Sequence, residues 1–386
     1  MEFPHTKAQS AFRADVREFV EAAVRPVAAE LDRTETYPAS LLDEMAERGW
    51  TGLTIAEKYG GAGTTVVELA ICIEELSRVM MPLASTVALH LGVAAEIESL
   101  GSESICNQYL PAMARFETVA ALGLTEATAG TDTYAMRTTA ERDGSEWVLS
   151  GEKQWVTNYR NADVLLIYAK TGPPTDEPAN ISAFLVPAAS VTKETVWETI
   201  GARSVKSVAV SFDGIRVPTA QQIGPVGAAY SKRGAAGIGI NLPARAVGIA
   251  AGALAETIET AGFDPQRSTR ESSAQATRHA IADLVTQLRT ARLQTLQAAQ
   301  RIAEGTARPA ELAMVKVQVT ETCLEITEAC LEVQGWAGVT NNRDIERFVR
   351  DARLLLIAGG PNDNHRNSIA DTVIEQADQA TQPDTT

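Results

Sequence analysis

The spacing of apolar residues predicts helices from the N-terminus to about residue 117. Near the start of the chain, apolar side chains recur every three or four residues, which places them on one helix face. They are Phe12, Val16, Phe19, Val20, Ala23, Val24 and Val27. A second such face consists of Leu69, Ile73, Leu76 and Met80. The glycine-rich residues 59–63 have no preceding strand and no Lys-Ser/Thr ending, so we predict a turn between helices and not a phosphate-binding loop.

The pattern changes at about residue 118 to short runs that are rich in β-branched residues. The runs at residues 164–169, 181–186 and 208–212 are bounded by Gly, Pro or Asn, which is typical of strands. Asp143-Gly144 lies between two alternating segments and predicts a hairpin. Ser150-Gly151 is expected to turn the chain a second time.

Helical spacing returns after about residue 225. One long stripe comprises Ile281, Leu284, Val285, Leu288 and Leu296. Pro309 is typical of the first turn of a helix, and the helical pattern continues from there to about residue 333. Residues 241–260 are rich in Ala and Gly, so we expect this helix to pack closely on all sides.

These patterns predict an α+β protein of three domains. They are an N-terminal helical domain over residues 1–117, a middle β-barrel-like domain over residues 118–224, and a C-terminal four-helix bundle over residues 225–377. The polar residues 378–386 are expected to form a disordered tail. A chain of 386 residues is long enough for two or three hydrophobic cores.

Charge and composition argue against nucleic acid or an anionic membrane as a partner. The chain has 34 basic and 49 acidic residues, a net charge of −15, whereas either partner would require a basic surface. The apolar run at residues 246–255 is too short to span a bilayer, and the first residues contain no apolar signal segment. The scattered cysteines and histidines predict reduced thiols, a cytoplasmic location and no metal site.

Residues 122–158 carry the candidate chemistry. A predicted strand at residues 119–125 leads into the small-residue loop 127–132, whose backbone N–H groups are little shielded by side chains. Residues 155–158 are expected to return beside this strand and to bring an aromatic plane and a hydroxyl group to the loop. This arrangement favours a seat for a planar heteroaromatic cofactor; the alternative is an ordinary β-domain with Trp155 in its core.

Two motifs in this segment resemble the flavin cradle of the acyl-CoA dehydrogenase family. The chain reads L-T-E-x-x-A-G-T-D from Leu124 to Asp132, and then W-V-T-N from Trp155 to Asn158. The resemblance implies FAD as cofactor and an acyl-CoA or carrier-bound acyl thioester as substrate. Thr131 would contact the substrate as well as FAD, and Arg245 matches an arginine near the acyl-CoA site. The implied FAD contacts are Leu124, Thr125, Gly130, Thr131, Trp155, Val156 and Thr157.

The chain departs from the family at the catalytic base. The family usually carries a glutamate in I-Y-E-G-T, after an R-D-A-R run that is present here at residues 350–353. The corresponding residue here is Gly359. Some members carry the glutamate just before the arginine that matches Arg245, but here that residue is Ala244. Asp363 lies one turn further on, where a helix-capping role is the favoured interpretation.

Two motifs by which the family reaches the FAD of a neighbouring subunit are also altered. The R-x-x-F-G motif is missing from residues 262–270. The Q-x-x-G-G-x-G turn begins here with Glu332, and a carboxylate near a pyrophosphate would repel it.

Three functions remain open on the sequence alone. The first is an FAD-dependent acyl thioester dehydrogenase that lacks the usual glutamate. The second is a base-less subunit of a hetero-oligomeric dehydrogenase, and the third is a flavin monooxygenase of the same fold. The family resemblance implies an oligomer in each case, formed either by copies of this chain or with a related chain.

Overall fold

The computed structural model describes residues 4–130, 132–172, 180–227, 229–230, 238–260 and 275–381. The chain forms two compact units. Unit 1 contains Met1–Val20, Ala70–Met81 and Gly239–Thr386, and unit 2 contains Glu21–Leu69 and Pro82–Ile238. Helices of the predicted N-terminal domain thus fall into both units, because the segments 1–20 and 70–81 pack with the C-terminal helices.

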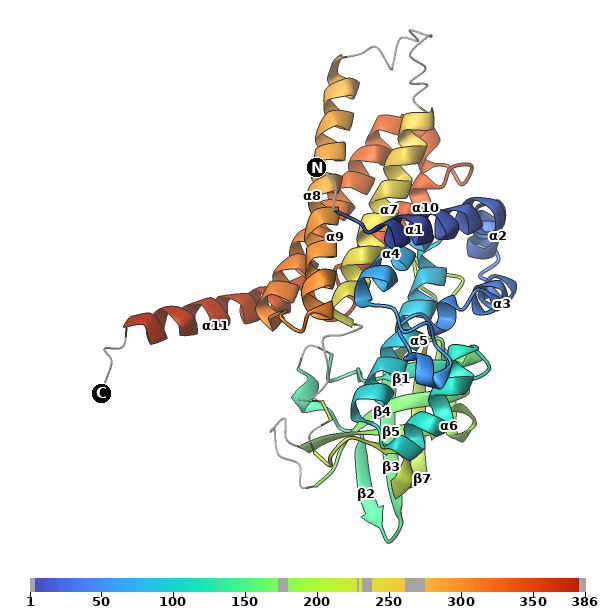
Figure 1. Cartoon of the computed structure of the whole chain (residues 1–386), viewed down its shortest axis with the longest axis vertical. Coiled ribbons are helices and arrows are strands. Elements are labelled where there is room, and N and C mark those ends of the chain that lie inside the picture. The colour runs from blue at the N-terminus through green and yellow to red at the C-terminus, as the bar shows by residue number, and fades with distance from the viewer. Residues whose placement is uncertain are drawn as a thin grey trace. The chain divides into compact units, whose positions relative to one another are not determined.

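The helices of unit 1 include the predicted C-terminal bundle. The bundle helices are α7 (Ile238–Thr260), α8 (Gln275–Ala303), α9 (Pro309–Gln334), α10 (Ile345–Leu355) and α11 (Asn362–Thr381). Figure 1 shows α7, α8 and α9 as neighbours and the later part of α11 projecting away from α8 and α9. The first helix of the unit, α1 (Lys7–Phe19), begins with a capping box in which Thr6 and Gln9 each bind the other's backbone N–H.

Glycines let α7 approach α4 (Val66–Ser77) closely. A methyl group on Gly248 would overlap the carbonyl oxygen of Glu74, and one on Gly252 would overlap that of Arg78. The close packing on all sides that was predicted for this helix is confirmed for residues 240–254, nearly all of which are buried, but it does not extend to the exposed Ala255, Ile258 and Glu259. Glu74 is itself buried and forms ion pairs with Arg13 of α1 (2.9 Å) and Arg292 of α8 (2.8 Å). These contacts join the helices of unit 1 around α4.

The end of α11 corrects one prediction. Residues 378–386 were expected to be disordered from their polarity, but α11 continues through Thr381. Between residues 362 and 381 the chain has no Pro or Gly to interrupt the helix, and Pro383 lies beyond its end. Residues 382–386 lie outside the described part of the chain.

Unit 2 combines helices with a single sheet. Its helices include α2 (Arg25–Arg33), α3 (Ala39–Glu47), α5 (Met81–Leu100) and α6 (Glu103–Ala114). The glycine-rich residues 60–63 form part of the connection before α4, so the turn predicted there is confirmed. By length and composition α5 is apolar enough to cross a membrane, but 72% of its most apolar window is buried within the protein.

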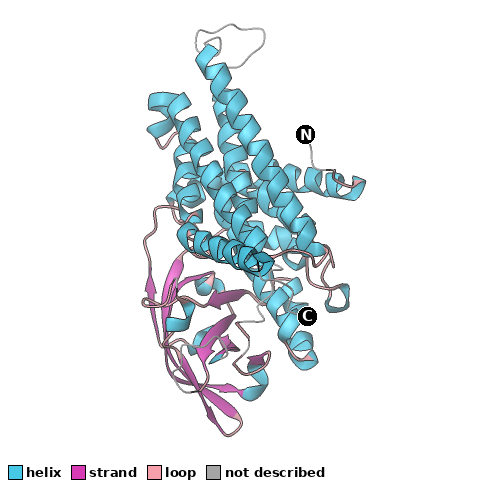
Figure 2. Cartoon of the chain, turned by 90° about the vertical axis from the view of Figure 1, so that its left-hand side faces the viewer, coloured by secondary structure: helices cyan, strands magenta, loops and turns pink. Residues whose placement is uncertain are grey.

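The sheet confirms the β-rich middle region and is shown in magenta in Figure 2. Its strands follow the order β6-β7-β3-β2-β4-β5-β8, and β1 pairs in parallel with β4. Apolar side chains of several strands, among them Leu149, Val156 and Phe184, form its core. The strands are β1 (Ala120–Gly123), β2 (Thr139–Asp143), β3 (Glu146–Thr157), β4 (Val164–Lys170), β5 (Ile181–Pro187), β6 (Lys193–Val196), β7 (Ser207–Pro218) and β8 (Gln222–Ile223).

Two local turns differ from their predictions. The β2–β3 hairpin exists, but its loop is Gly144-Ser145, because Asp143 still pairs with Glu146 and only Gly144 (φ 61°) has a positive φ at this turn. Ser150-Gly151 does not turn the chain. It forms a bulge inside β3, where a methyl group on Gly151 would lie 2.6 Å from the Cα atom of Thr138.

Candidate functional site

A buried ion pair positions the loop that follows β1. Lys153 is fully buried, and its Nζ atom lies 2.7 Å from Oε1 of Glu126. The Glu126 carboxylate also accepts hydrogen bonds from the backbone N–H groups of Arg137 (2.6 Å) and Thr138 (3.0 Å). The pair therefore fixes both ends of the segment 126–138.

Burial disfavours the charged form of both residues of this pair, whereas each residue favours the charged form of the other. Burial lowers the pKa of Lys153 to about 8, although Glu126 favours its charged form. Burial alone would raise the pKa of Glu126, but the ammonium group of Lys153 and the N–H donors outweigh burial and lower it. Sequence reasoning missed this pair; the only signal was a charged residue at the inward-facing strand position of Lys153.

The loop itself has the properties of a ligand seat. Glu126 and Ala129 exchange two backbone hydrogen bonds of 3.2 Å, which closes the loop into a tight turn. Within the described chain, no residue accepts a hydrogen bond from the backbone N–H of Ala127, Thr128 or Gly130. Among the residues that the structure describes, a methyl group on Gly130 would meet only Cγ2 of Thr125, at 4.0 Å. The described residues therefore do not themselves require glycine at this position and leave space beside it.

The two sequence motifs lie side by side, as predicted. The carbonyl oxygen of Leu124 accepts a hydrogen bond from Nζ of Lys153 (3.1 Å), and that of Thr125 accepts one from the backbone N–H of Gln154 (2.8 Å). Thr131 lies outside the described residues.

Trp155 is held in an unusual backbone conformation. Its φ angle is 58°, a value that bulky residues rarely adopt, at an irregularity in the β3–β7 pairing between Lys153 and Val156. The side chain is 54% exposed, so the alternative that Trp155 is a core residue is wrong. Its ring stacks on that of Trp197, with centroids 5.5 Å apart and an angle of 29° between the planes. Trp155 therefore presents an aromatic surface to solvent.

The rest of this motif is anchored in the protein. Val156 is fully buried in the core of the sheet, so only its backbone is available to a ligand. The hydroxyl groups of Thr157 and Ser207 lie 3.2 Å apart. Asn158 (φ 71°) donates from Nδ2 to the carbonyl oxygen of Thr86 (3.0 Å), while its buried Oδ1 atom accepts from none of the described residues.

Arg245 lies in the interior of unit 1. Its residue exposure is 7%, and its Nη1 atom lies 3.8 Å from Sδ of Met81. Burial lowers the pKa of the guanidinium group to about 10, although the carboxylate of Asp351 acts in the opposite direction. Only a small part of the side chain is therefore open to a substrate.

The two positions expected for a catalytic base have no side chain that can take up a proton. Ala244 is 1% exposed. Gly359 (φ 65°) lies between α10 and α11, where a methyl group would come 2.5 Å from Cδ1 of Leu242. Its carbonyl oxygen lies 3.0 Å from Nε2 of His365, while its N–H donates to none of the described residues. Asp363 is exposed and pairs with Arg366 at 3.2 Å; because α11 begins at Asn362, Asp363 lies inside the first turn and the predicted capping position is wrong, although a carboxylate there still favours the helix start.

Lys316 fixes the connection that contains Gly359. This α9 residue is 4% exposed and donates to the carbonyl oxygens of Leu356 (3.2 Å) and Gly360 (2.8 Å) and to Oδ1 of Asn362 (2.5 Å). Burial lowers its pKa to about 8. Sequence reasoning missed this residue as well, because its acceptors come from a segment far along the chain.

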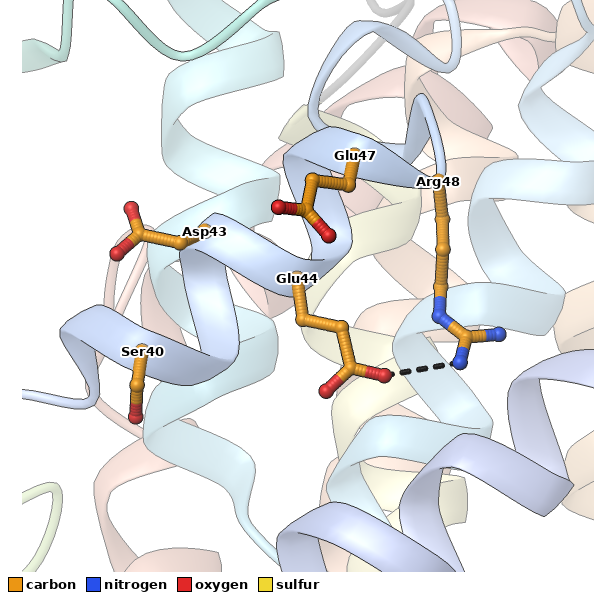
Figure 3. Close-up of a pocket in the computed structure, with 5 residues that line it drawn as sticks. All are labelled: Ser40, Asp43, Glu44, Glu47 and Arg48. Carbon is orange, nitrogen blue, oxygen red and sulfur yellow. Dashed lines mark hydrogen bonds and ion pairs between the residues drawn. The ribbon is translucent and has the colours of Figure 1, made fainter.

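An open hollow on α3 is not a comparable site. Figure 3 shows its lining residues, Ser40, Asp43, Glu44, Glu47 and Arg48, on one face of a single helix. Glu44 and Arg48 form an exposed ion pair of 2.8 Å. The described ranges contain no cluster of three or more His, Cys, Asp or Glu that could hold a metal ion. All four cysteines are buried and form no disulfide.

Comparison with known proteins covers nearly the whole chain. Residues 6–117 match the acyl-CoA dehydrogenase N-terminal domain, residues 121–215 the middle domain, and residues 237–374 the C-terminal domain of the same family. A relative from Clostridium acetobutylicum, named as a short-chain-specific acyl-CoA dehydrogenase, is 31% identical over 94% of this chain and 97% of its own length.

Two solved structures have the same fold. Butyryl-CoA dehydrogenase from Megasphaera elsdenii has a TM-score of 0.91 and 25% identity, over 97% of this chain and 100% of its own. Glutaryl-CoA dehydrogenase from Mycobacterium smegmatis, in complex with FADH2, has a TM-score of 0.87 and 25% identity, over 96% of this chain and 95% of its own.

Proposed function

Because this chain belongs to the acyl-CoA dehydrogenase family, we propose that it is an FAD-dependent oxidoreductase that dehydrogenates an acyl thioester between its α and β carbons. One observation carries the proposal. The loop at residues 127–130 offers the N–H groups of Ala127, Thr128 and Gly130, from which no described residue accepts. Thr125, just before this loop, pairs with Gln154, the residue next to the exposed Trp155. A planar, polyoxygenated cofactor fits such a seat.

The residues of this seat fit FAD in character. Trp155 would lie along the ring system, and Thr125, Gly130 and Thr157 would contact polar edges, with Leu124 beside them. Thr131 would contact both FAD and the thioester. Val156 would contribute through its backbone alone, since its side chain is buried in the core. When bound, FAD supplies an acceptor for the hydride that leaves the β carbon.

The chain retains a means of polarising the substrate carbonyl. The backbone N–H of Gly359 donates to no described residue, and Lys316 holds the adjoining carbonyl groups in place. An N–H aimed at a thioester oxygen stabilises the charge that develops there and makes the α proton more acidic. We therefore assign Gly359 the role of oxyanion donor without that of base.

The second candidate is a base-less subunit of a hetero-oligomeric dehydrogenase. Its support is the exposed carboxylate of Glu332, on the motif with which the family contacts a neighbour's FAD. Residues 262–270, where the family has R-x-x-F-G, lie outside the described residues. A flavin monooxygenase, the third candidate, has only the empty base position in its favour. A cytoplasmic location remains a prediction.

One experiment separates these functions. The protein is purified alone and together with a related chain from the same source, and each sample is titrated anaerobically with acyl-CoA thioesters. Loss of flavin absorbance in the isolated chain supports the dehydrogenase. Loss only in the co-purified sample supports the hetero-oligomer. A flavin that thioesters do not reduce, but that consumes O₂ when a flavin reductase is supplied, would contradict both.

A further inference from the structure

The conformation of Trp155 requires an explanation beyond its own strand. Its backbone lies in the left-handed region (φ 58°), and its side chain remains 54% exposed. A bulky residue in this conformation is strained, and such strain persists only where neighbouring groups fix the residue. Burial does not account for it, since a residue placed for core packing would not leave half of its surface in solvent.

Trp197 is the aromatic neighbour that fixes it. The Trp197 backbone N–H donates to the carbonyl oxygen of Ser207 (3.0 Å) and so extends the β6–β7 pairing by one residue. From this position its ring stacks on Trp155 at 5.5 Å. The stack covers one face of the Trp155 ring, and we attribute the exposure of Trp155 to the opposite face.

The segment that carries Trp197 is anchored at its other end by charge. Arg203 forms an ion pair of 2.9 Å with Glu35, and Lys206 pairs with the same carboxylate. Glu35 follows α2 and itself has a positive φ of 54°. Residues 197–206 are thus tied at one end to the sheet and at the other to the end of α2, which limits how far Trp197 can move from Trp155.

An exposed ring on a strained backbone, backed by a second ring on an anchored segment, is a preorganised surface. A ligand that stacks on such a surface does not have to order the side chain on binding, so less of the binding energy is lost. The exposed ring is flat and aromatic. Its neighbour Gln154 donates from its backbone N–H to the carbonyl oxygen of Thr125 (2.8 Å), two residues before the loop of N–H donors at residues 127–130. These features select a planar heteroaromatic ring with polar edges.

We propose that Trp197 is a positioning residue that holds Trp155 as a rigid platform for the flavin ring. The proposal rests on the function proposed above. Trp197 does not itself contact the cofactor in this account; it acts through the orientation of Trp155. The same reasoning assigns Glu35 a supporting role, through the segment that carries Trp197.

The test uses the full-length protein with Trp197 replaced. Trp197→Leu removes the stack, Trp197→Phe retains an aromatic ring, and Trp336→Leu is the control, since Trp336 is 88% exposed and belongs to unit 1. The chain has five tryptophans, so 5-fluorotryptophan labelling gives a spectrum simple enough to assign by single substitutions. In the protein without FAD, we expect Trp197→Leu to move the ¹⁹F resonance of Trp155 toward the value of the free amino acid. Trp336→Leu should leave it in place.

The second measurement is the dissociation constant of FAD. We expect Trp197→Leu to raise it about tenfold, the size of an aromatic stacking contribution, and Trp197→Phe to raise it much less. The proposal is overturned if the Trp155 resonance does not move in Trp197→Leu, or if it moves while FAD affinity stays the same. Wild-type protein that binds no FAD would refute the proposed function, whereas the ¹⁹F spectrum still decides whether Trp197 fixes Trp155.

Discussion

Gly359 can supply the backbone N–H donor that is proposed for this position, but it cannot supply the carboxylate base. Its backbone offers an N–H donor, but its φ of 65° and the nearby Leu242 leave little room for a side chain. A carboxylate at this position therefore needs both a strained backbone and a smaller neighbour. The chain has lost more than the glutamate itself, because its surroundings are now shaped for glycine.

The missing base can be supplied by design. We predict that Gly359→Glu combined with Leu242→Ala reduces the flavin with an acyl-CoA at least about 100-fold faster than Gly359→Gln with the same Leu242 change, the lower end of a general base's contribution. Both variants share the loss of Leu242 packing and the strain at residue 359, so they differ only in the ionisable group. Stopped-flow reduction under anaerobic conditions measures the rate. Equal rates in the two variants would show that a base at this position is not what the chain lacks.

His90 of α5 forms hydrogen bonds to α6 and to β1, and these bonds make the stability of the protein depend on pH. Its Nδ1 atom accepts from the backbone N–H of Ala120 in β1 (3.3 Å), and its Nε2 atom lies 3.0 Å from the carbonyl oxygen of Met113 in α6. The ring therefore has to be neutral. Burial lowers its pKa to about 4, although the bond to Met113 acts in the opposite direction.

The sign of the effect follows from this lowered pKa. Below pH 6.5 the unfolded chain binds a proton that the folded chain takes up only near pH 4, so stability falls as the pH falls through this range. We predict a loss of up to about 1.4 kcal/mol per pH unit from this residue. In His90→Gln, whose amide can replace both hydrogen bonds, the loss between pH 7 and 5 should be smaller. Urea unfolding of both proteins measures it, and identical pH profiles would refute the assignment.

The close approach of α7 to the end of α4 can be tested by the sign of a stability change when a glycine of α7 is replaced by alanine. Replacing glycine by alanine inside a helix ordinarily stabilises it by roughly 0.5–1 kcal/mol. At Gly252, however, the added methyl group would overlap the carbonyl oxygen of Arg78 and lie 2.9 Å from Cζ of Phe348. We therefore predict that Gly252→Ala lowers the free energy of unfolding by about 1–3 kcal/mol. A stabilised variant in chemical denaturation would mean that the two helices are not in close contact.

Elements that depend on local pattern were predictable from the sequence, and contacts between distant segments were not. The runs of β-branched residues predicted β4, β5 and β7. The two motifs were also predicted to lie side by side, and Gln154 indeed pairs with Thr125. The shift of the hairpin loop to Gly144-Ser145 and the bulge at Gly151 depend on strand register, which the local pattern does not fix. The Trp155–Trp197 stack likewise depends on where two separate strands end.

Each of the two compact units contains residues for which a role is proposed. Glu126, Lys153 and Trp155, which form or support the proposed flavin site, belong to unit 2. Arg245, Lys316 and Gly359 belong to unit 1. The sequence departs from the family in unit 1, at the base position, whereas both cradle motifs of unit 2 are intact.

The FAD content of this chain purified by itself tests the account most directly. The protein is expressed without any related chain, incubated with excess FAD, desalted, and its flavin-to-protein ratio determined by absorbance after denaturation. We predict a ratio close to one FAD per chain, together with a higher unfolding temperature in the presence of FAD, because the cofactor binds the folded state. A ratio near zero that rises only on co-expression with a related chain would contradict the claim that this chain holds the flavin on its own.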